Sequence, residues 1–93
     1  MSVSVQDNAD RHRYELFVDG SLAGFADYRS RDGRVIVTHS EVDPSFRGQG
    51  LGSILARESL DGLRERGVRV VPSCPFFAKY VSEHPEYADL VDD

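Results

Sequence analysis

Residues 35–63 constrain the fold of this 93-residue chain more than any other stretch. They begin with a run rich in β-branched side chains, 35–42, and continue through a turn that has three glycines in five residues. An amphipathic pattern follows from Leu51. β-Branched residues favour strands, and glycine allows backbone conformations that a Cβ would obstruct. We therefore predict a strand, a glycine turn and a helix, in that order.

The glycine turn, residues 47–52, predicts an anion-binding site. The N-terminus of a helix presents free backbone N–H groups and a partial positive charge. Arg47 adds a permanent charge and a planar fork of donors. The turn is not the dinucleotide fingerprint, because Ser53 stands where the third glycine would fall, and no Gly-Lys-Ser/Thr follows. A purely structural turn would leave Arg47 unexplained, so we interpret the turn as the pyrophosphate site of a cofactor.

The first half of the chain predicts an antiparallel meander. Extended runs at 2–6, 11–18 and 21–30 precede the strand at 35–42, and Asp-Gly pairs stand in two of the turns between them. Within 21–30, alternation predicts one face that carries Leu22, Gly24, Ala26 and Tyr28. Such a sheet needs one covered face, which the later helices must supply.

The second half predicts one main helix and a short helical end. From Leu51 six positions, five of them apolar, fill one half of a helical wheel. These positions are Leu51, Leu55, Ala56, Ser59, Leu60 and Leu63. Gly67 ends the helix, and 68–71 form a strand parallel to 35–42 through a right-handed crossover. Residues 76–83 predict a short second helix. The fold class is therefore α/β (α+β), a mixed, mostly antiparallel sheet in a single domain over 1–93.

Composition excludes several classes of function. A net charge of −5 argues against a nucleic-acid binder, which usually has a basic face. No apolar run approaches the roughly 20 residues of a membrane span. The single cysteine, Cys74, allows no internal disulfide, which fits the cytoplasm. Three scattered histidines and one cysteine lack the spacing of metal ligands, so we expect no metal site.

The sequence resembles the GNAT superfamily of N-acetyltransferases, and within it the short YjdJ type of GNAT-like proteins. Arg47, Gly50 and Gly52 match the pattern Gln/Arg-x-x-Gly-x-Gly/Ala, after a strand and at the start of a helix. The other matching segments are 37–42, 48–55, 72–76, Tyr80 and 84–87. The resemblance implies acetyl-coenzyme A as the cofactor and acetyl transfer to an amine of a small molecule or peptide. Ordinary GNAT domains also carry two helices between their first and second strands and two strands after the last helix, which this sequence lacks.

The resemblance also implies which residues hold coenzyme A. Backbone amides of the turn would bind its pyrophosphate, from Arg47, Gly48, Gln49, Gly50, Leu51 and Gly52. The strand at 39–42, which ends at Val42, would pair with the pantetheine arm and direct a backbone N–H at the thioester oxygen.

Four side chains are candidates for the chemistry. His39 and Glu41 are candidate bases that share a face of their strand; otherwise they are ordinary solvent-facing residues. Cys74 could accept the acetyl group or donate a proton; otherwise it is a small buried hydrophobe. Many GNAT enzymes use a tyrosine at a spacing like that of Tyr80 to protonate the thiolate; otherwise Tyr80 packs beside Phe77.

Three functions follow from this reading. The favoured one is an acetyl-coenzyme A-dependent N-acetyltransferase. The alternatives are a module of the same fold that binds acyl-coenzyme A without turnover, and a small interaction protein that retains only the fold.

Overall fold

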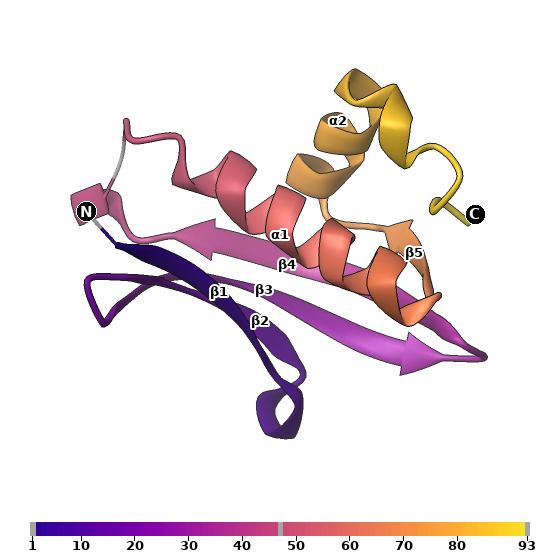
Figure 1. Ribbon diagram of the computed structural model, residues 1–93, viewed down its shortest axis with the longest axis horizontal. Coiled ribbons are helices and arrows are strands. Elements are labelled where there is room, and N and C mark those ends of the chain that lie inside the picture. Colours follow the sequence, from indigo (N-terminus) through magenta and orange to yellow (C-terminus); the bar gives the residue numbers. More distant parts are fainter. Residues whose placement is uncertain (1, 47, 93) are drawn as a thin grey trace.

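The computed structural model, which describes residues 2–46 and 48–92, is a single curved sheet with its helices beside one face (Figure 1). The five strands are ordered β1-β2-β3-β4-β5. They are β1 (Val3–Asn8), β2 (Arg13–Val18), β3 (Ser21–Arg31), β4 (Arg34–Val42) and β5 (Arg69–Pro72). The first four are antiparallel neighbours, and β5 pairs with β4 in parallel. The predicted mixed, mostly antiparallel sheet is confirmed.

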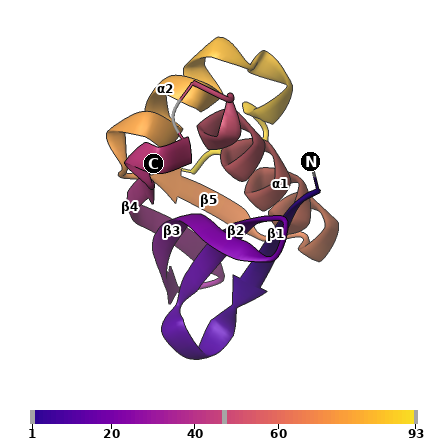
Figure 2. The same cartoon turned by 90° about the vertical axis from the view of Figure 1, so that its left-hand side faces the viewer.

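Two α-helices and three short 3-10 turns complete the fold. They are α1 (Leu51–Arg66), α2 (Pro75–Glu83), η1 (Ala9–Arg11), η2 (Pro44–Phe46) and η3 (Pro85–Tyr87). α1 contacts all five strands, and α2 contacts α1, β4 and β5. Figure 2 shows the sheet curving beneath α1. None of the described helices combines the length and apolar character needed to cross a bilayer.

The core lies between α1 and the sheet. The buried residues of α1 are those that the helical wheel predicted, Leu51, Leu55, Ala56, Ser59, Leu60 and Leu63. They meet Tyr14, Leu16 and Val18 of β2, Val35 and Val37 of β4, Val70 of β5 and Phe77 of α2. Burying a leucine side chain contributes roughly 1.5–3 kcal/mol, so this helix face supplies much of the stability.

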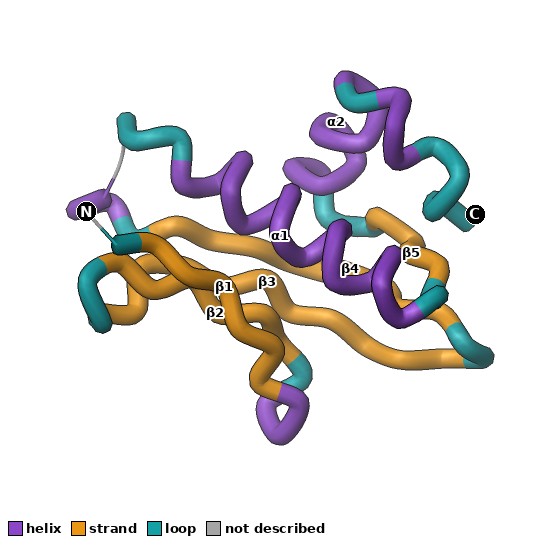
Figure 3. The backbone as a smooth tube through the Cα atoms, in the orientation of Figure 1, coloured by secondary structure: helices purple, strands orange, loops and turns teal. Residues whose placement is uncertain are grey.

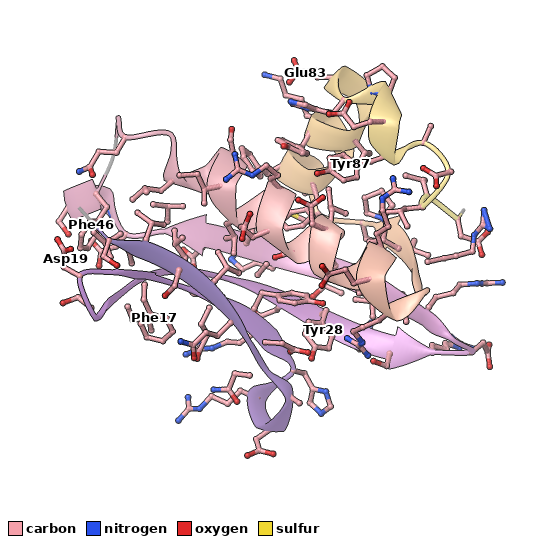
Figure 4. The ribbon with its side chains drawn as sticks, viewed as in Figure 1. Phe17, Asp19, Tyr28, Phe46, Glu83 and Tyr87 are labelled. Atoms are coloured by element: carbon pink, nitrogen blue, oxygen red, sulfur yellow. The ribbon has the colours of Figure 1, made fainter. Side chains whose placement is uncertain are left out.

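The face predicted for 21–30 is wrong at Leu22. Leu16 pairs with Gly24, but the next residue, Phe17, pairs with Leu22, so Ala23 is an extra residue in β3. This bulge buries Ala23 and turns Leu22 outward, where it is 44% exposed. Figure 4 shows Phe17, the partner of Leu22, on the face away from α1. Periodicity alone does not reveal an inserted residue.

The C-terminal segment is tied to α1 and β5. The Arg64 guanidinium donates to both carboxylate oxygens of Asp89, at 2.8 and 2.9 Å, and to the Glu86 carbonyl oxygen. The Tyr87 hydroxyl donates to Asp61 of α1 at 2.6 Å. Val91 forms an isolated parallel bridge with Val70. These contacts hold η3 and the residues after it against the main helix.

Candidate functional site

β4 and β5 separate after a short parallel pairing. The register runs from Arg34–Arg69 to Val37–Pro72. The Cys74 N–H then donates to the Val37 carbonyl oxygen at 2.8 Å, and the chain turns away into α2. β4 continues to Val42, and within the described chain residues 38–42 have no strand partner on that side. Part of the β4 backbone edge is therefore open.

A second bulge decides which β4 side chains face α1. Asp27 pairs with His39, but Tyr28 pairs with Val37, so Thr38 is the extra residue. Before the bulge Val35 and Val37 are buried beneath the helix. After it, Ser40 takes the inner position, since its Oγ lies 3.1 Å from Sγ of the buried Cys74. His39 and Glu41 therefore face the outer side of the sheet.

The bulge also leaves backbone donors at the open edge. The Asp43 N–H donates to the Ala23 carbonyl oxygen of β3 at 2.7 Å. Because successive residues of a strand direct their backbone groups to alternate edges, the N–H groups of Ser40 and Val42 point to the edge that β5 has left. The backbone N–H of Val42, a predicted cofactor-binding residue, is thus directed to this open edge.

The N-terminus of α1 lies at the same end of the molecule (Figure 3). Gly50 is the N-cap, at φ 69° and ψ 19°, and Gly48 has φ 80°. These left-handed conformations favour glycine. Among the described residues, no side chain caps the helix and no carboxylate lies in its first turn. Within the described part of the chain, its first backbone N–H groups therefore have no partner that would compete with an anion. Arg47 lies outside the described residues, and Gln49 is exposed.

Two adjoining hollows connect the helix N-terminus to the open strand edge. One, of about 250 Å³, is lined by Val42, Phe46, Gly48, Gly50, Leu51, Gly52, Ser53 and Phe76. The other, also about 250 Å³, is lined by Ser40, Glu41, Val42, Gly52, Leu55 and Phe76. Because they share Val42, Gly52 and Phe76, we treat them as one feature, the α1 groove. Phe46, labelled in Figure 4, lies on η2 beside the glycine turn.

Gly52 provides room in the α1 groove. A Cβ at this position would lie 3.0 Å from Cζ of Phe76, closer than most real Cβ contacts. Phe76 is 41% exposed although it is a large hydrophobic residue. Its ring therefore forms an apolar wall of the groove. The groove combines free backbone donors at one end, an open strand edge along its length and an apolar wall, which suits an extended ligand with an anionic end.

The structure places the four candidate catalytic side chains in three locations. Cys74 is 3% exposed and lies beside Ser40, which lines the α1 groove, but Cys74 is not itself among the lining residues. On the outer face, Nε2 of His39 lies 3.3 Å from Oε2 of Glu41, as their shared strand face predicted. The contact of Ser40 with Cys74 could not be predicted from the sequence, because alternation along an unbroken strand places Ser40 on the outer face.

Tyr80 lines a third hollow, between α1 and α2. This hollow, of about 260 Å³, is lined by Ser53, Phe76, Lys79, Tyr80, Glu83 and His84, and it meets the α1 groove at Ser53 and Phe76. The Tyr80 ring stacks on His84, with 3.9 Å between centroids. Burial raises the pKa of the Tyr80 phenol above its ordinary value. Tyr80 therefore adjoins the groove but is not among the residues that line it.

Comparison with known proteins gives a family match over most of the chain. Residues 13–90 match a family model described as GCN5-related N-acetyl-transferase. Streptothricin acetyltransferase from Streptomyces lavendulae is 45% identical over 64 residues, which are 67% of this chain and 34% of that protein. Protein NATD1 from Homo sapiens is 35% identical over 51 residues, which are 55% of this chain and 45% of that protein. The chain thus spans a third to a half of the length of these relatives.

A solved structure shows the same fold. The solution structure of a GCN5-like protein from Staphylococcus aureus superposes with a TM-score of 0.73. The match covers 99% of this chain and 91% of that one, at 20% sequence identity. The overall fold is therefore shared with a protein of very different sequence.

Proposed function

Because the chain belongs to the GCN5-related N-acetyl-transferase family, we propose that it transfers an acetyl group from acetyl-coenzyme A to an amine. Assignment to the short YjdJ type, and an acceptor that is a small molecule or a peptide, belong to the same proposal. The observation that carries it is the α1 groove, in which an uncapped helix N-terminus continues into the open edge of β4.

The residues of the groove fit coenzyme A. The N–H groups of residues 50–53 would hold its pyrophosphate, because they combine donors with the positive end of the helix. The backbone of Ser40 and Val42 would bind the amide groups of the pantetheine arm. When bound, acetyl-coenzyme A supplies a thioester carbonyl carbon that an amine can attack and a thiol that can leave.

The side chains have separate proposed roles. In the overall exchange a nitrogen–carbon bond forms, the carbon–sulfur bond breaks, and one proton moves from the amine to the departing sulfur. His39 and Glu41, on the outer face, are the proposed acceptors of the amine proton. Cys74 or Tyr80 would donate a proton to the sulfur. In a relay variant, Cys74 carries the acetyl group as its own thioester before the amine takes it. Unchanged turnover in Cys74→Ala would remove Cys74 from the mechanism.

The test of the cofactor site compares two glycine substitutions. Gly50 and Gly33 both have positive φ and open space around them, so an aspartate costs similar backbone strain at each. Only Gly50 lies at the helix N-terminus. Gly50→Asp should weaken coenzyme A binding about tenfold or more in calorimetry, because a carboxylate there repels the pyrophosphate. Gly33→Asp should bind as the wild type does; equal affinities in all three proteins would refute the site.

One observation favours a second candidate, an acyl-coenzyme A-binding module without turnover. β1 and β2 are joined only by the 3-10 turn η1, where the longer members of the superfamily that the sequence resembles carry two helices. Release of free thiol from acetyl-coenzyme A on addition of amines separates the two functions. Calorimetric binding without amine-dependent thiol release would favour the module.

A further inference from the structure

The outer face of the sheet has a hollow of its own beside the end of β4. It measures about 260 Å³ and is lined by Leu22, Ala23, Gly24, Phe25, Glu41, Val42, Asp43 and Pro44. We call it the outer hollow. Two of its residues, Glu41 and Val42, also line the α1 groove. The two sites therefore meet at the end of β4.

The outer hollow has apolar walls that the fold does not need. Among the described residues, Leu22 and Phe76 are the large hydrophobic side chains that stay exposed, at 44% and 41%. Phe76 lines the α1 groove, and Leu22 lines the outer hollow, where the bulge at Ala23 directs it outward. An exposed hydrophobic residue in a hollow is available to a ligand.

In the part of the chain that the structure describes, both charged groups that line the outer hollow are acidic. They are the carboxylates of Glu41 and Asp43. Asp43 accepts hydrogen bonds from the N–H and hydroxyl of Ser45 through one oxygen, and its other oxygen has no partner among residues 2–46 and 48–92. The guanidinium of Arg13 lies 5.1 Å from the centre of the Phe25 ring, but it pairs with Glu15 at 2.7 Å. His39 also faces this side and contacts Glu41.

We propose that the outer hollow binds the acceptor as a primary amine carried on a short apolar group. The ammonium would lie at Glu41 and Asp43, and the apolar group against Leu22 and Phe25. This inference rests on the proposed function and adds the chemical class of its substrate. The hollow is smaller than the roughly 300–1,000 Å³ of sites for drug-sized ligands, so it fits a small amine or a single side chain.

The position of the outer hollow suits a substrate of the proposed reaction. Its amine would lie next to His39 and Glu41, the residues that we propose to accept its proton. An amine there would reach the α1 groove past Glu41 and Val42, which line both sites. Nucleophile and thioester would therefore approach each other from opposite faces of the sheet.

Three small probes test the chemical class by amide chemical shifts of the full chain. Phenethylamine carries both an ammonium and an apolar ring, 2-phenylethanol lacks the charge, and ethanolamine lacks the ring. Phenethylamine should shift amides of residues 22–25 and 41–43 and bind about tenfold more tightly than either of the others. Equal binding of the three, or shifts confined to other residues, would overturn the proposal.

A matched pair of variants tests the wall residue. Leu22→Ser should weaken phenethylamine binding about fivefold and lower kcat/KM for it by a similar factor. Ile36→Ser removes an aliphatic side chain from the same face outside the hollow, and it should leave both values within about twofold. Thermal midpoints of the two variants verify that both are folded. If Leu22→Ser bound phenethylamine as tightly as the wild type does, the proposal would be contradicted.

Coenzyme A calorimetry on the same samples separates this inference from the proposed function. If coenzyme A binds and polar amines release thiol as well as phenethylamine does, the acetyltransferase stands and the acceptor class is wrong. If phenethylamine binds in the outer hollow while coenzyme A does not bind, the proposed function fails and the acceptor role with it.

Discussion

At the scale of single residues, the site depends on small groups in particular positions. Gly52 leaves space that Phe76 and the groove share, and Ser40 meets Cys74 because Thr38 is an extra residue. Motif and resemblance predicted Gly52 and Cys74 as site residues, and both roles stay predictions. The sequence did not predict the position of Ser40, because alternation along an unbroken strand would place Ser40 on the face of the sheet away from Cys74.

A pair of glycine-to-alanine changes in α1 tests the role of Gly52. Alanine in a helix is favoured over glycine by roughly 0.5–1 kcal/mol. At Gly62, where a Cβ meets nothing within 4 Å, Gly62→Ala should gain that amount in free energy of unfolding and leave coenzyme A affinity unchanged. Gly52→Ala should gain less, because Phe76 must move, and should weaken coenzyme A binding. Denaturant titration measures the free energy of unfolding, and calorimetry measures the coenzyme A affinity. If both variants gave the same change in both quantities, Gly52 would not provide room for the ligand.

At the scale of elements, regular patterns were predictable and interruptions were not. The 3.6-residue period of 51–63 identified every buried residue of α1, because packing on one sheet face imposes that period. The bulges at Ala23 and Thr38 each shift alternation by one residue without a local sequence signal. The bridge between Val70 and Val91 involves too few residues to form a recognisable strand.

Truncation of one leucine tests how far α1 supports the sheet. Leu60 is fully buried, so Leu60→Ala should lower the free energy of unfolding by about 2–5 kcal/mol through lost burial and a cavity. Leu22→Ala, at a position that is 44% exposed, should cost less than about 1 kcal/mol. Urea titrations of both variants provide the comparison. A decrease of less than about 1 kcal/mol in the free energy of unfolding of Leu60→Ala would show that packing of α1 on the sheet is not the main contribution to stability.

At the scale of the whole molecule, all four tyrosines are held in the protonated form. Burial is the largest cause that raises the pKa of Tyr14, Tyr28, Tyr80 and Tyr87. Hydrogen bonds to Asp7 and Asp61 add to it for Tyr28 and Tyr87. The four phenols form two pairs, Tyr14 with Tyr28 at 5.2 Å between ring centroids and Tyr80 with Tyr87 at 6.0 Å. Their ionisation therefore reports on two regions of the fold.

Alkaline titration follows from these raised pKa values. The pKa of a tyrosine in the unfolded chain is about 10, and these phenols have a higher pKa in the native state. Each phenol therefore stabilises the native state fully below pH 10, and this contribution is lost as the pH rises through the native pKa. Ultraviolet absorbance of the native protein should therefore show little phenolate at pH 10 and a steep rise on alkaline unfolding. The denatured chain should titrate near 10. Gradual native ionisation centred at 10 would contradict the buried placement.

The central claim is that main-chain donors at the start of α1 hold the pyrophosphate of coenzyme A beside the open edge of β4. An amide chemical-shift titration of the full chain with coenzyme A tests it most directly. The account predicts large, saturable shifts at Gly50, Leu51 and Gly52, accompanied by shifts at Ser40 and Val42 on the strand edge. Saturable shifts confined to other parts of the chain, or no shifts at millimolar coenzyme A, would contradict it.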